Sequence, residues 1–360
     1  MDIQDFIGIA PFSLNKEDKQ MMLSEVLNDL TLHHYNNSEY YRNMLIGLSF
    51  TPNKGAKICD IPFLPVRLFK NFDLLSVQKD EVVKTMTSSG TTGQSVSKIY
   101  LDRETASNQT KVLTKIVSSF LGNKRMPMLV IDSESTLKDR NKFSARGAGI
   151  LGFSMFGTRI TYALNNEMEL NVDIINTFLE KCNGEPIFIF GFTFMIWQHL
   201  IKEAELKKIN FDFSNAIIIH GGGWKKLASE SVSSELFKKK LFDAFGISKV
   251  YDYYGMVEQT GSIFVECEYN YLHAPIFSDI IIRRPNDFSV ANFNEIGVIQ
   301  LVSILPKSYP GHSILSEDEG VVIGEDDCQC GRKGKYFKII GRIKNAEIRG
   351  CSDTYAEKFR

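Results

Sequence analysis

The sequence has no long hydrophobic run, no excess of either charge and few cysteines for its length. Its 360 residues contain neither an apolar stretch of about 18 residues nor a basic leader followed by apolar residues, so we expect no membrane span and no signal peptide. With 42 Lys and Arg against 43 Asp and Glu, the net charge of -1 gives no electrostatic footprint for nucleic acid. Six scattered cysteines do not make a disulfide scaffold. These absences favour a cytoplasmic enzyme that acts on a small molecule.

A glycine- and hydroxyl-rich segment follows a strand-like stretch at 81–86. This glycine-rich segment consists of Thr87, Ser88, Ser89, Gly90, Thr91, Thr92 and Gly93. Glycines let backbone N–H groups approach an anion, the hydroxyls add donors, and Lys98 offers a positive charge. The sequence contains no Gly-Lys-Ser/Thr string, which excludes a Walker-type loop. An apolar helical period over 102–120 comes next, so strand, phosphate loop and helix are predicted in that order.

The middle of the chain alternates between two kinds of segment. Short β-rich runs at 128–132, 186–191 and 216–223 end in glycine or polar residues, and helical patterns cover 172–182 and 194–207. This order predicts an α/β fold with a mainly parallel sheet, whose ligands bind at the carboxyl ends of strands. From about residue 262 the runs become closely spaced strands, which predicts a smaller β-rich part. The first 60 residues read as mostly helical scaffold.

Four further motifs follow in order along the chain. They are Gly221-Gly222-Gly223 after a strand, Asp252-Tyr253-Tyr254-Gly255-Met256-Val257-Glu258, Ser316-Glu317-Asp318-Glu319-Gly320, and Gly341-Arg342. With the glycine-rich segment, they resemble the motif set of the adenylate-forming superfamily, which makes acyl-AMP from a carboxylic acid and ATP. One departure is that Lys98 follows the last glycine later than is usual.

The resemblance implies a role for each motif. The glycine turn with Gly222 and Gly223 would lie against adenine, and Tyr253 or Tyr254 would stack on it beside Gly255. Glu258 would hold Mg²⁺, because this ion prefers hard oxygen ligands. Asp318 would accept hydrogen bonds from the ribose hydroxyls, and Arg342 would contact ribose or phosphate. His220, directly before the glycine turn, is a candidate for contact with the carboxylate or adenylate, or else a core histidine.

Several strings narrow the resemblance to one branch. They are Ile61 to Val66, Phe143 to Gly147, Ser308-Tyr309-Pro310-Gly311-His312-Ser313, and Gly341 to Cys351, and they resemble the acyl-protein synthetases (LuxE type). The chain ends soon after Arg342, so we expect the mobile C-terminal domain of acyl-CoA synthetases to be largely missing. In this branch a cysteine near the C-terminus accepts the acyl group and a partner reductase makes the aldehyde, which implies Cys351 as acceptor.

Three cysteines and a histidine suggest a metal site. Cys267 and His273 lie in one β-rich segment, and Cys328 and Cys330 lie in another. Such a set fits tetrahedral structural zinc, and phenylacetate-CoA ligase-like members of the superfamily carry a comparable site. Four reduced side chains without a metal are the alternative.

The expected function is ATP- and Mg²⁺-dependent activation of a fatty acid, followed by transfer to Cys351 for a partner reductase. We expect a helical scaffold at 1–60, a nucleotide-binding α/β core at 61–260, a β-rich part at 261–343 and a tail at 344–360. Two alternatives stay open. The adenylate could go to CoA or a carrier-protein thiol, as in phenylacetate-CoA ligases, or the chain could be a non-catalytic nucleotide-binding subunit.

Overall fold

The computed structural model describes residues 3–53, 55–88, 96–138, 145–224 and 230–343. The chain divides into two compact units. Unit 1 comprises the described parts of 1–88, 95–120 and 254–347, and unit 2 comprises the described part of 121–253. Within these ranges no helix combines the length and the apolar character that a membrane crossing requires.

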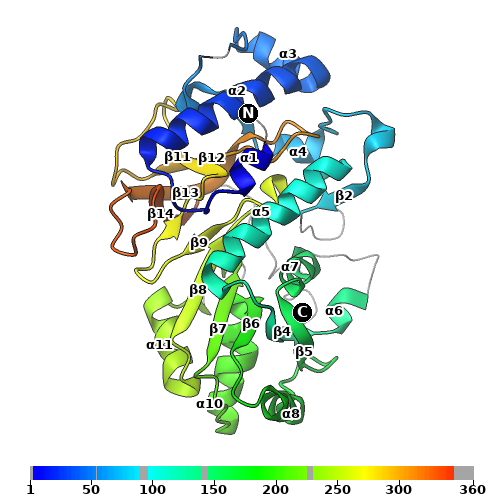
Figure 1. The fold of residues 1–360 in the computed structure, drawn as a ribbon, viewed down its shortest axis with the longest axis vertical. Helices are drawn as coiled ribbons and strands as arrows, with labels where there is room; N and C mark the ends of the chain where they lie inside the picture. Colours follow the sequence, from blue (N-terminus) through cyan, green and yellow to red (C-terminus); the bar gives the residue numbers. More distant parts are fainter. Residues whose placement is uncertain (1–2, 54, 89–95, 139–144, 225–229, 344–360) are drawn as a thin grey trace. The chain divides into compact units, whose positions relative to one another are not determined.

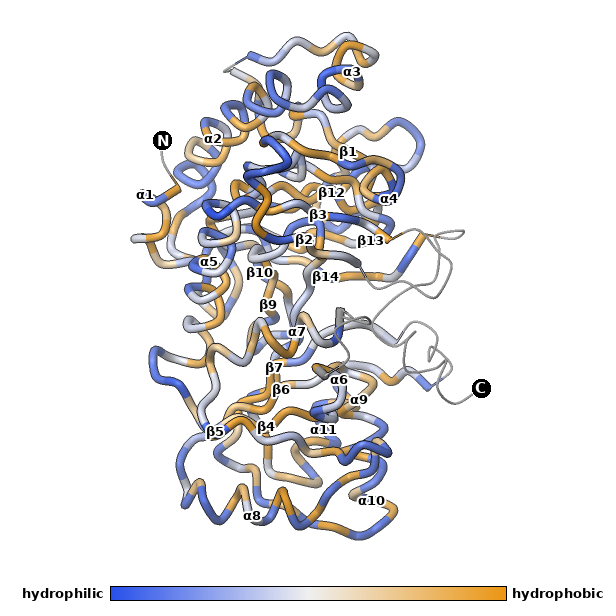
Figure 2. The backbone as a smooth tube through the Cα atoms, turned by 90° about the vertical axis from the view of Figure 1, so that its right-hand side faces the viewer, coloured by the Kyte–Doolittle hydropathy of each residue, from blue (hydrophilic) through white to orange (hydrophobic). Residues whose placement is uncertain are grey.

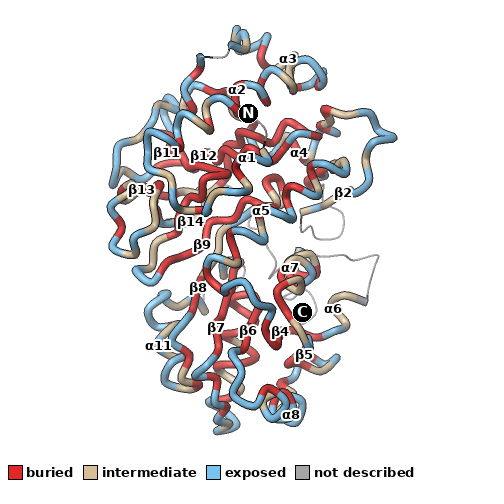
Figure 3. Tube along the Cα trace, viewed as in Figure 1, coloured by how far each residue is buried: buried red, intermediate tan, exposed pale blue. Residues whose placement is uncertain are grey.

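Unit 2 is built on five parallel strands in the order β5-β4-β6-β7-β8 (Figure 1). Strands β4, β6 and β7 are buried along their whole length, as Figure 3 shows. Their isoleucine, valine and phenylalanine runs appear as hydrophobic segments in Figure 2. Branched and aromatic side chains suit a strand covered on both faces, which explains the central position of these three. The strands are β4 (Met126–Ser133), β5 (Gly157–Leu164), β6 (Ile187–Phe192), β7 (Ala216–Gly221) and β8 (Lys249–Tyr254).

Two of the unit 2 helices, α8 and α11, begin and end at recognisable caps. The Asn171 side chain accepts a hydrogen bond from the Ile174 N–H at the start of α8, and Asn183 ends this helix in the left-handed conformation. Ser233 and Gly246 do the same for α11. The helices are α6 (Ser135–Lys138), α7 (Ala145–Ser154), α8 (Val172–Cys182), α9 (Thr193–Met195), the π-helical η4 (Ile196–Lys202), α10 (Glu203–Lys207) and α11 (Ser234–Phe245).

Unit 1 contains an antiparallel β-rich part. Its strands β11, β12, β13 and β14 are neighbours in that order, and β10 lies between β14 and β9. The short β1 pairs with β13 in parallel. The core of this sheet includes Phe264, Ile280, Ile299 and Phe337. The strands are β1 (Leu64–Pro65), β9 (Phe264–Glu266), β10 (Leu272–His273), β11 (Ser278–Arg283), β12 (Gly297–Ser303), β13 (Ser313–Glu325) and β14 (Lys335–Arg342).

Helices and one hairpin complete unit 1. Asn15 caps α2 by accepting from the Asp18 N–H, and the acidic first turn suits the helix dipole. A separate pair of antiparallel strands, β2 and β3, lies on either side of the glycine-rich segment in the sequence. The elements are α1 (Ile3–Ile7), α2 (Lys16–Asn37), α3 (Glu39–Gly47), η1 (Ile58–Asp60), α4 (Leu68–Asn71), η2 (Lys79–Glu81), β2 (Lys84–Thr87), β3 (Lys98–Leu101), α5 (Arg103–Leu121) and η6 (Val257–Gln259).

A buried lysine joins α2 to the β-rich part. Lys19 is only 2% exposed, and its Nζ donates to the Ala274 carbonyl at 3.0 Å and lies 3.5 Å from Asp279 Oδ1. Lys335 donates to the other oxygen of Asp279 at 2.7 Å. Burial lowers the pKa of Lys19, and the Asp279 charge opposes this effect. The helical N-terminal region is therefore part of the core of unit 1.

The predicted α/β class and parallel sheet are confirmed. The prediction of strand from residue 81 is wrong, since residues 79–81 form a 3-10 turn in which Glu81 accepts from the Gln78 N–H, and β2 begins at Lys84. The predicted helix at 194–207 is present in three pieces, with a π-helical stretch in the middle.

Candidate functional site

The glycine-rich segment is closed at its base by two serines. Thr87 ends β2, and the next residue, Ser88, exchanges hydrogen bonds with Ser97: the Ser88 N–H donates to the Ser97 carbonyl at 3.1 Å, and the Ser97 N–H donates to the Ser88 hydroxyl at 2.9 Å. Ser89, Gly90, Thr91, Thr92 and Gly93 lie outside the described residues, so their phosphate-binding role stays a prediction. The hairpin pairs Thr87 with Lys98, which lie on either side of these residues.

Lys98 lies on the exposed face of the hairpin. Along β3, Ile99 and Leu101 are buried, and so is Ser97 just before it, whereas the Lys98 side chain is 51% exposed. Its Nζ lies 3.8 Å from Asp73 Oδ1. Because alternate residues of a strand point to opposite faces, Lys98 and Ser97 point in opposite directions. Its predicted role at phosphate remains untested.

Glu258 is a buried carboxylate on η6, 5% exposed. Burial raises the pKa of its carboxyl group, and the Ser97 hydroxyl and the charges of Lys70 and Arg342 oppose that rise. The Ser97 hydroxyl oxygen has no partner at ordinary hydrogen-bond distance among the described residues, so it acts on Glu258 as a dipole at slightly longer range. Glu258 therefore lies in the electrostatic reach of the base of the glycine-rich segment.

A second group of predicted residues meets within unit 1, where Tyr254 lies beside β13 and β14. The Tyr254 hydroxyl donates to Asp318 Oδ2 at 2.7 Å, and Arg342 Nε donates to Asp318 Oδ1 at 3.3 Å. Burial and the Asp318 charge raise the pKa of Tyr254 well above its ordinary value, so it remains a hydrogen-bond donor at neutral pH. Asp318 and Arg342 are paired directly across β13 and β14, so the strand register places their side chains next to each other. Gly255, an exposed residue, separates Tyr254 from η6.

Two residues of this group were not predicted from the sequence. Glu317 lies beside Asp318, and Arg67 donates to its Oε1, while Arg342 Nη1 lies 4.0 Å from its Oε2. Arg67 follows β1, and the parallel pairing of β1 with β13 places it near Glu317. The acidic string at 316–320 was a signal for Glu317, but Arg67 carried no signal beyond its position after the 61–66 string.

In unit 2, the glycine turn lies at the carboxyl end of β7. An added Cβ at Gly221 would come within 2.4 Å of the Tyr253 ring, and one at Gly222 within 2.7 Å of the Phe192 ring. Gly222 also has φ +75°, which disfavours any other residue. Gly223 has open space at the Cβ position. Gly221 and Gly222 thus allow aromatic rings to lie against the backbone. Gly223 has no heavy atom within 4 Å of an added Cβ, so a side chain would fit there.

His220 lies within the buried strand β7 as a neutral imidazole. Its Nδ1 lies 2.9 Å from the Thr193 hydroxyl and 3.6 Å from Asp252 Oδ1. Burial, helped by the charge of Lys238, lowers the pKa of His220 to about 3. At neutral pH it can act only through hydrogen bonds, so both the predicted contact with the adenylate and the core alternative remain. Cys351 lies outside the described residues.

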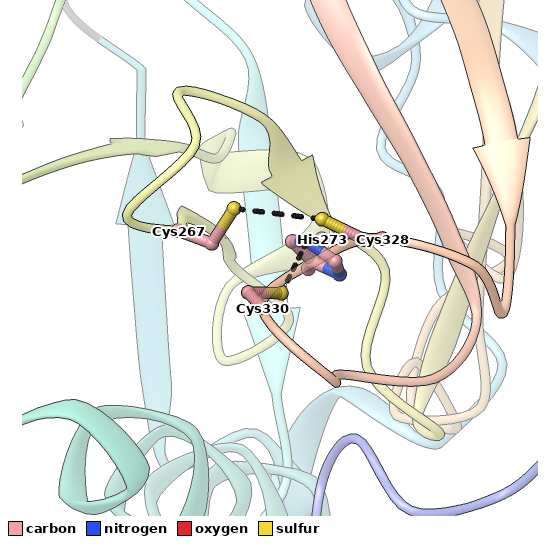
Figure 4. A group of neighbouring side chains, drawn as sticks. All are labelled: Cys267, His273, Cys328 and Cys330. Carbon is pink, nitrogen blue, oxygen red and sulfur yellow. Dashed lines mark hydrogen bonds between the residues drawn. The ribbon is translucent and has the colours of Figure 1, made fainter.

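The four predicted metal ligands are neighbours in unit 1 (Figure 4). Ligand atoms of Cys267, His273, Cys328 and Cys330 all lie within 4.8 Å of one another. Cys267 follows β9 and His273 ends β10, whereas the other two cysteines lie in the turn between β13 and β14. A metal here would join the two hairpins.

Two distances between these ligand atoms match tetrahedral zinc. Bonds of about 2.3 Å to sulfur and about 2.0 Å to nitrogen require about 3.8 Å between two sulfurs and about 3.5 Å between sulfur and nitrogen. The structure has 3.9 Å from Cys267 Sγ to Cys328 Sγ, and 3.4 Å from Cys330 Sγ to His273 Nε2. Burial lowers the pKa of His273 to about 4, so its imidazole is neutral, as a ligand must be. The residues therefore fit a zinc ion.

Comparisons with solved structures identify the fold of the chain. A 2-hydroxyisobutyryl-CoA ligase, solved in an open conformation with 2-HIB-AMP and CoA, superposes with a TM-score of 0.69 at 14% identity, covering 96% of this chain and 81% of that chain. The same ligase in its thioesterification state gives 0.69 at 15% identity, over 93% and 70%. These structures show that the chain has the fold of an adenylate-forming ligase.

Sequence comparisons extend over the whole chain. A long-chain-fatty-acid–luciferin-component ligase of Aliivibrio fischeri is 24% identical, covering 98% of this chain and 92% of the relative. That of Vibrio harveyi is 22% identical, over 99% and 94%. The sequence model described as acyl-protein synthetase, LuxE, matches residues 1–360. The chain therefore belongs to the LuxE family of acyl-protein synthetases.

Proposed function

We propose that this protein activates a long-chain fatty acid with ATP to acyl-AMP and then transfers the acyl group to its own Cys351 as a thioester. The substrate class follows the names of the relatives, which are long-chain-fatty-acid ligases. The single observation that carries the proposal is the Tyr254–Asp318–Arg342 group together with the buried Glu258 in unit 1. A protein that had lost catalysis would have no need to keep these polar groups together.

The proposed nucleotide contacts use groups that already have partners in the free protein. The Asp318 carboxylate accepts from Tyr254 and Arg342, and it would turn to the ribose hydroxyls when ATP binds. Arg342, placed near Glu317 as well, would then be free to reach ribose or phosphate. Gly222 and Tyr253 of unit 2 would contact adenine, as the family resemblance implies. The glycine-rich segment would donate to the phosphate oxygens.

Glu258 would hold the magnesium ion that accompanies ATP. A buried carboxylate is a strong ligand for a hard cation, because the metal charge offsets the burial that raises the pKa of the free acid. Bound Mg²⁺ would supply neutralisation of phosphate charge. The protein's own contribution is to hold this carboxylate in position and to shield it from solvent.

The proposed chemistry has two steps. A carboxylate oxygen of the acid attacks the α-phosphorus of ATP, forms the acyl–phosphate bond and releases pyrophosphate. The Cys351 thiolate then attacks the acyl carbonyl, expels AMP and leaves an acyl-enzyme, with the thiol proton passing to solvent. A thioester keeps much of the activation of the adenylate and can be reduced to an aldehyde by a partner reductase. We assign the zinc site a structural role, since four protein ligands leave no open position.

Acid-dependent exchange of labelled pyrophosphate into ATP tests the first step. We expect exchange with long-chain fatty acids, loss of it in Glu258→Gln, and weaker exchange in Asp318→Asn. If no acid in a chain-length series supported exchange, the proposal would be refuted and a non-catalytic nucleotide-binding subunit would be favoured.

Labelling of the protein tests the second step. Incubation with ATP and a radiolabelled fatty acid should give a hydroxylamine-sensitive label that Cys351→Ala loses and Cys59→Ala keeps. Cys59, a partly exposed thiol on η1, is the matched control. Full labelling of Cys351→Ala would exclude this cysteine. Release of acyl-CoA on addition of CoA, without labelled protein, would instead support an acid–CoA ligase.

A further inference from the structure

The Ser308–His312 string has no role in the chemistry proposed above. Ser308, Tyr309 and His312 are all 0% exposed, so their side chains are closed off from solvent. Polar residues that are buried completely act through the groups to which they are hydrogen-bonded. The partners of this string therefore indicate its role.

The first residue of the string is tied to the hairpin that carries the glycine-rich segment. The Ser308 hydroxyl donates to the Tyr100 carbonyl on β3 at 2.8 Å, and the Ser308 N–H donates to the Thr105 hydroxyl in α5 at 3.2 Å. Its carbonyl accepts from the Ser76 N–H at 2.8 Å. Ser308 is thus fixed to the strand that follows the glycine-rich segment.

The middle of the string is tied to the peptide of Glu258. The Tyr309 hydroxyl donates to the Glu258 carbonyl at 2.9 Å, and the Gln109 amide donates to the Tyr309 oxygen at 3.4 Å. On the other side, the Gln259 amide donates to the Gly311 carbonyl at 2.8 Å. The approach at Gly311 is close, since an added Cβ would come within 3.0 Å of the Glu258 carbonyl oxygen.

The end of the string is anchored in α2. His312 Nε2 lies 3.0 Å from the Thr31 hydroxyl, which itself donates to the Leu27 carbonyl, so the imidazole is the donor to Thr31. The Tyr41 hydroxyl lies 3.4 Å from the same nitrogen. The string is therefore hydrogen-bonded at its start, middle and end to three separate parts of unit 1.

We propose that Tyr309 is a positioning residue for Glu258. The Ser308–His312 string would hold the Glu258 carboxylate in a fixed position relative to β3, the strand that follows the glycine-rich segment. The inference rests on the proposed function, in which Glu258 binds the metal of Mg-ATP. A hydrogen bond to the backbone carbonyl of Glu258 limits movement of its side chain, and a displacement of about 1 Å can cost about 100-fold in rate. Tyr309 itself touches neither nucleotide nor metal.

Tyr309→Phe tests the proposal, because it removes the hydroxyl and keeps the ring. The control is Tyr41→Phe, which removes another buried hydroxyl near His312 without a contact to Glu258. For each variant we would measure ATP affinity by calorimetry in EDTA and across a Mg²⁺ series, and the half-saturating Mg²⁺ in pyrophosphate exchange. Unfolding temperature in the absence of ligands reports any general loss of stability.

We expect Tyr309→Phe to raise half-saturating Mg²⁺ about 10-fold, the upper range for one neutral hydrogen bond, and to leave ATP affinity in EDTA within about 2-fold of the parent. Tyr41→Phe should change neither by more than about 2-fold. If Tyr309→Phe does not fold, Gln109→Met, which removes the donor to Tyr309, should show the same selective Mg²⁺ effect.

Two outcomes would separate the inference from the function on which it rests. A parent protein with exchange activity, together with a Tyr309→Phe variant that matches Tyr41→Phe in its Mg²⁺ dependence, would overturn the positioning role alone. A parent protein that neither exchanges pyrophosphate nor binds ATP more tightly with Mg²⁺ would overturn the proposed function, and the positioning role with it.

Discussion

Two stacked, buried histidines should make the protein sensitive to mild acid. His34 and His312 are both 0% exposed, and their rings stack at 4.8 Å between centroids. Burial lowers the pKa of His312 to about 3, with His33 adding to the effect. It lowers the pKa of His34 well below its ordinary value, again with help from the neighbouring imidazoles. Tyr41 also faces both rings.

The sign of the effect follows from proton binding. The folded state keeps both rings neutral down to low pH, whereas the unfolded state protonates them near pH 6.5. The unfolded state therefore binds more protons, and stability is lost as the pH falls below 6.5 until the folded-state pKa is reached. For His312, with a folded-state pKa near 3, the loss between pH 7 and pH 5.5 is about 1.2 kcal/mol, and His34 should add a loss of the same sign.

Urea unfolding at pH 7 and pH 5.5 measures this loss. In His312→Gln, the difference in unfolding free energy between the two pH values should be smaller than in the parent by about 1.2 kcal/mol, and His34→Gln should also make it smaller. The control is His33→Gln, which removes a half-buried imidazole of the same helix and should change this difference less. A parent pH dependence retained in full by both buried variants would refute the reasoning.

Three further predictions concern the glycine turn, the metal cluster and the Asp318 group. In urea unfolding, Gly222→Ala should destabilise the protein by about 2–4 kcal/mol, because residue 222 has a positive φ and the new Cβ would lie 2.7 Å from a ring atom. The control Gly223→Ala should cost less than about 1 kcal/mol, because there is open space at that Cβ position. Elemental analysis of purified protein should find one zinc per chain. Cys330→Ser or chelation should remove the zinc and lower the unfolding temperature by about 5–10 °C. A parent protein that contains no metal, or whose stability does not change when the metal is removed, would contradict the zinc prediction. Tyr254→Phe should raise KM for ATP in pyrophosphate exchange about 3- to 10-fold, and Asp318→Asn more strongly; equal KM values in all three proteins would exclude a nucleotide role for the pair.

The sequence predicted those parts of the fold in which local pattern and burial agree. The buried apolar runs became β4, β6 and β7, and the helix predicted at 172–182 is α8 with the same bounds. The π-helical stretch at 196–202 was not predictable, because helical periodicity does not distinguish hydrogen bonds to the fourth residue from those to the fifth. The start of β2 was missed because the Glu81 side chain bonds to the Gln78 backbone and favours a turn.

The candidate site was predicted in its residue types but not in its contacts. The motifs supplied Glu258, Asp318 and Arg342, and the zinc set was predicted from residue chemistry and a family resemblance. Tyr309 lies 51 residues from Glu258 in the sequence, and Arg67 lies 250 residues from Glu317. Contacts at such separations depend on strand pairing, which the local pattern of a single sequence does not specify. The direction of Lys98 likewise became clear only from the alternation along β3.

The burial of Lys19 has a consequence for anyone who dissects this protein. A fragment that begins after α2 would leave the Ala274 carbonyl without the Lys19 donor. Asp279 would keep Lys335 as its ammonium partner among the described residues, in a core that no longer contains the side chains of α2. The amino-terminal helix is therefore no dispensable extension, and trimming it to obtain a minimal nucleotide-binding fragment should yield insoluble material.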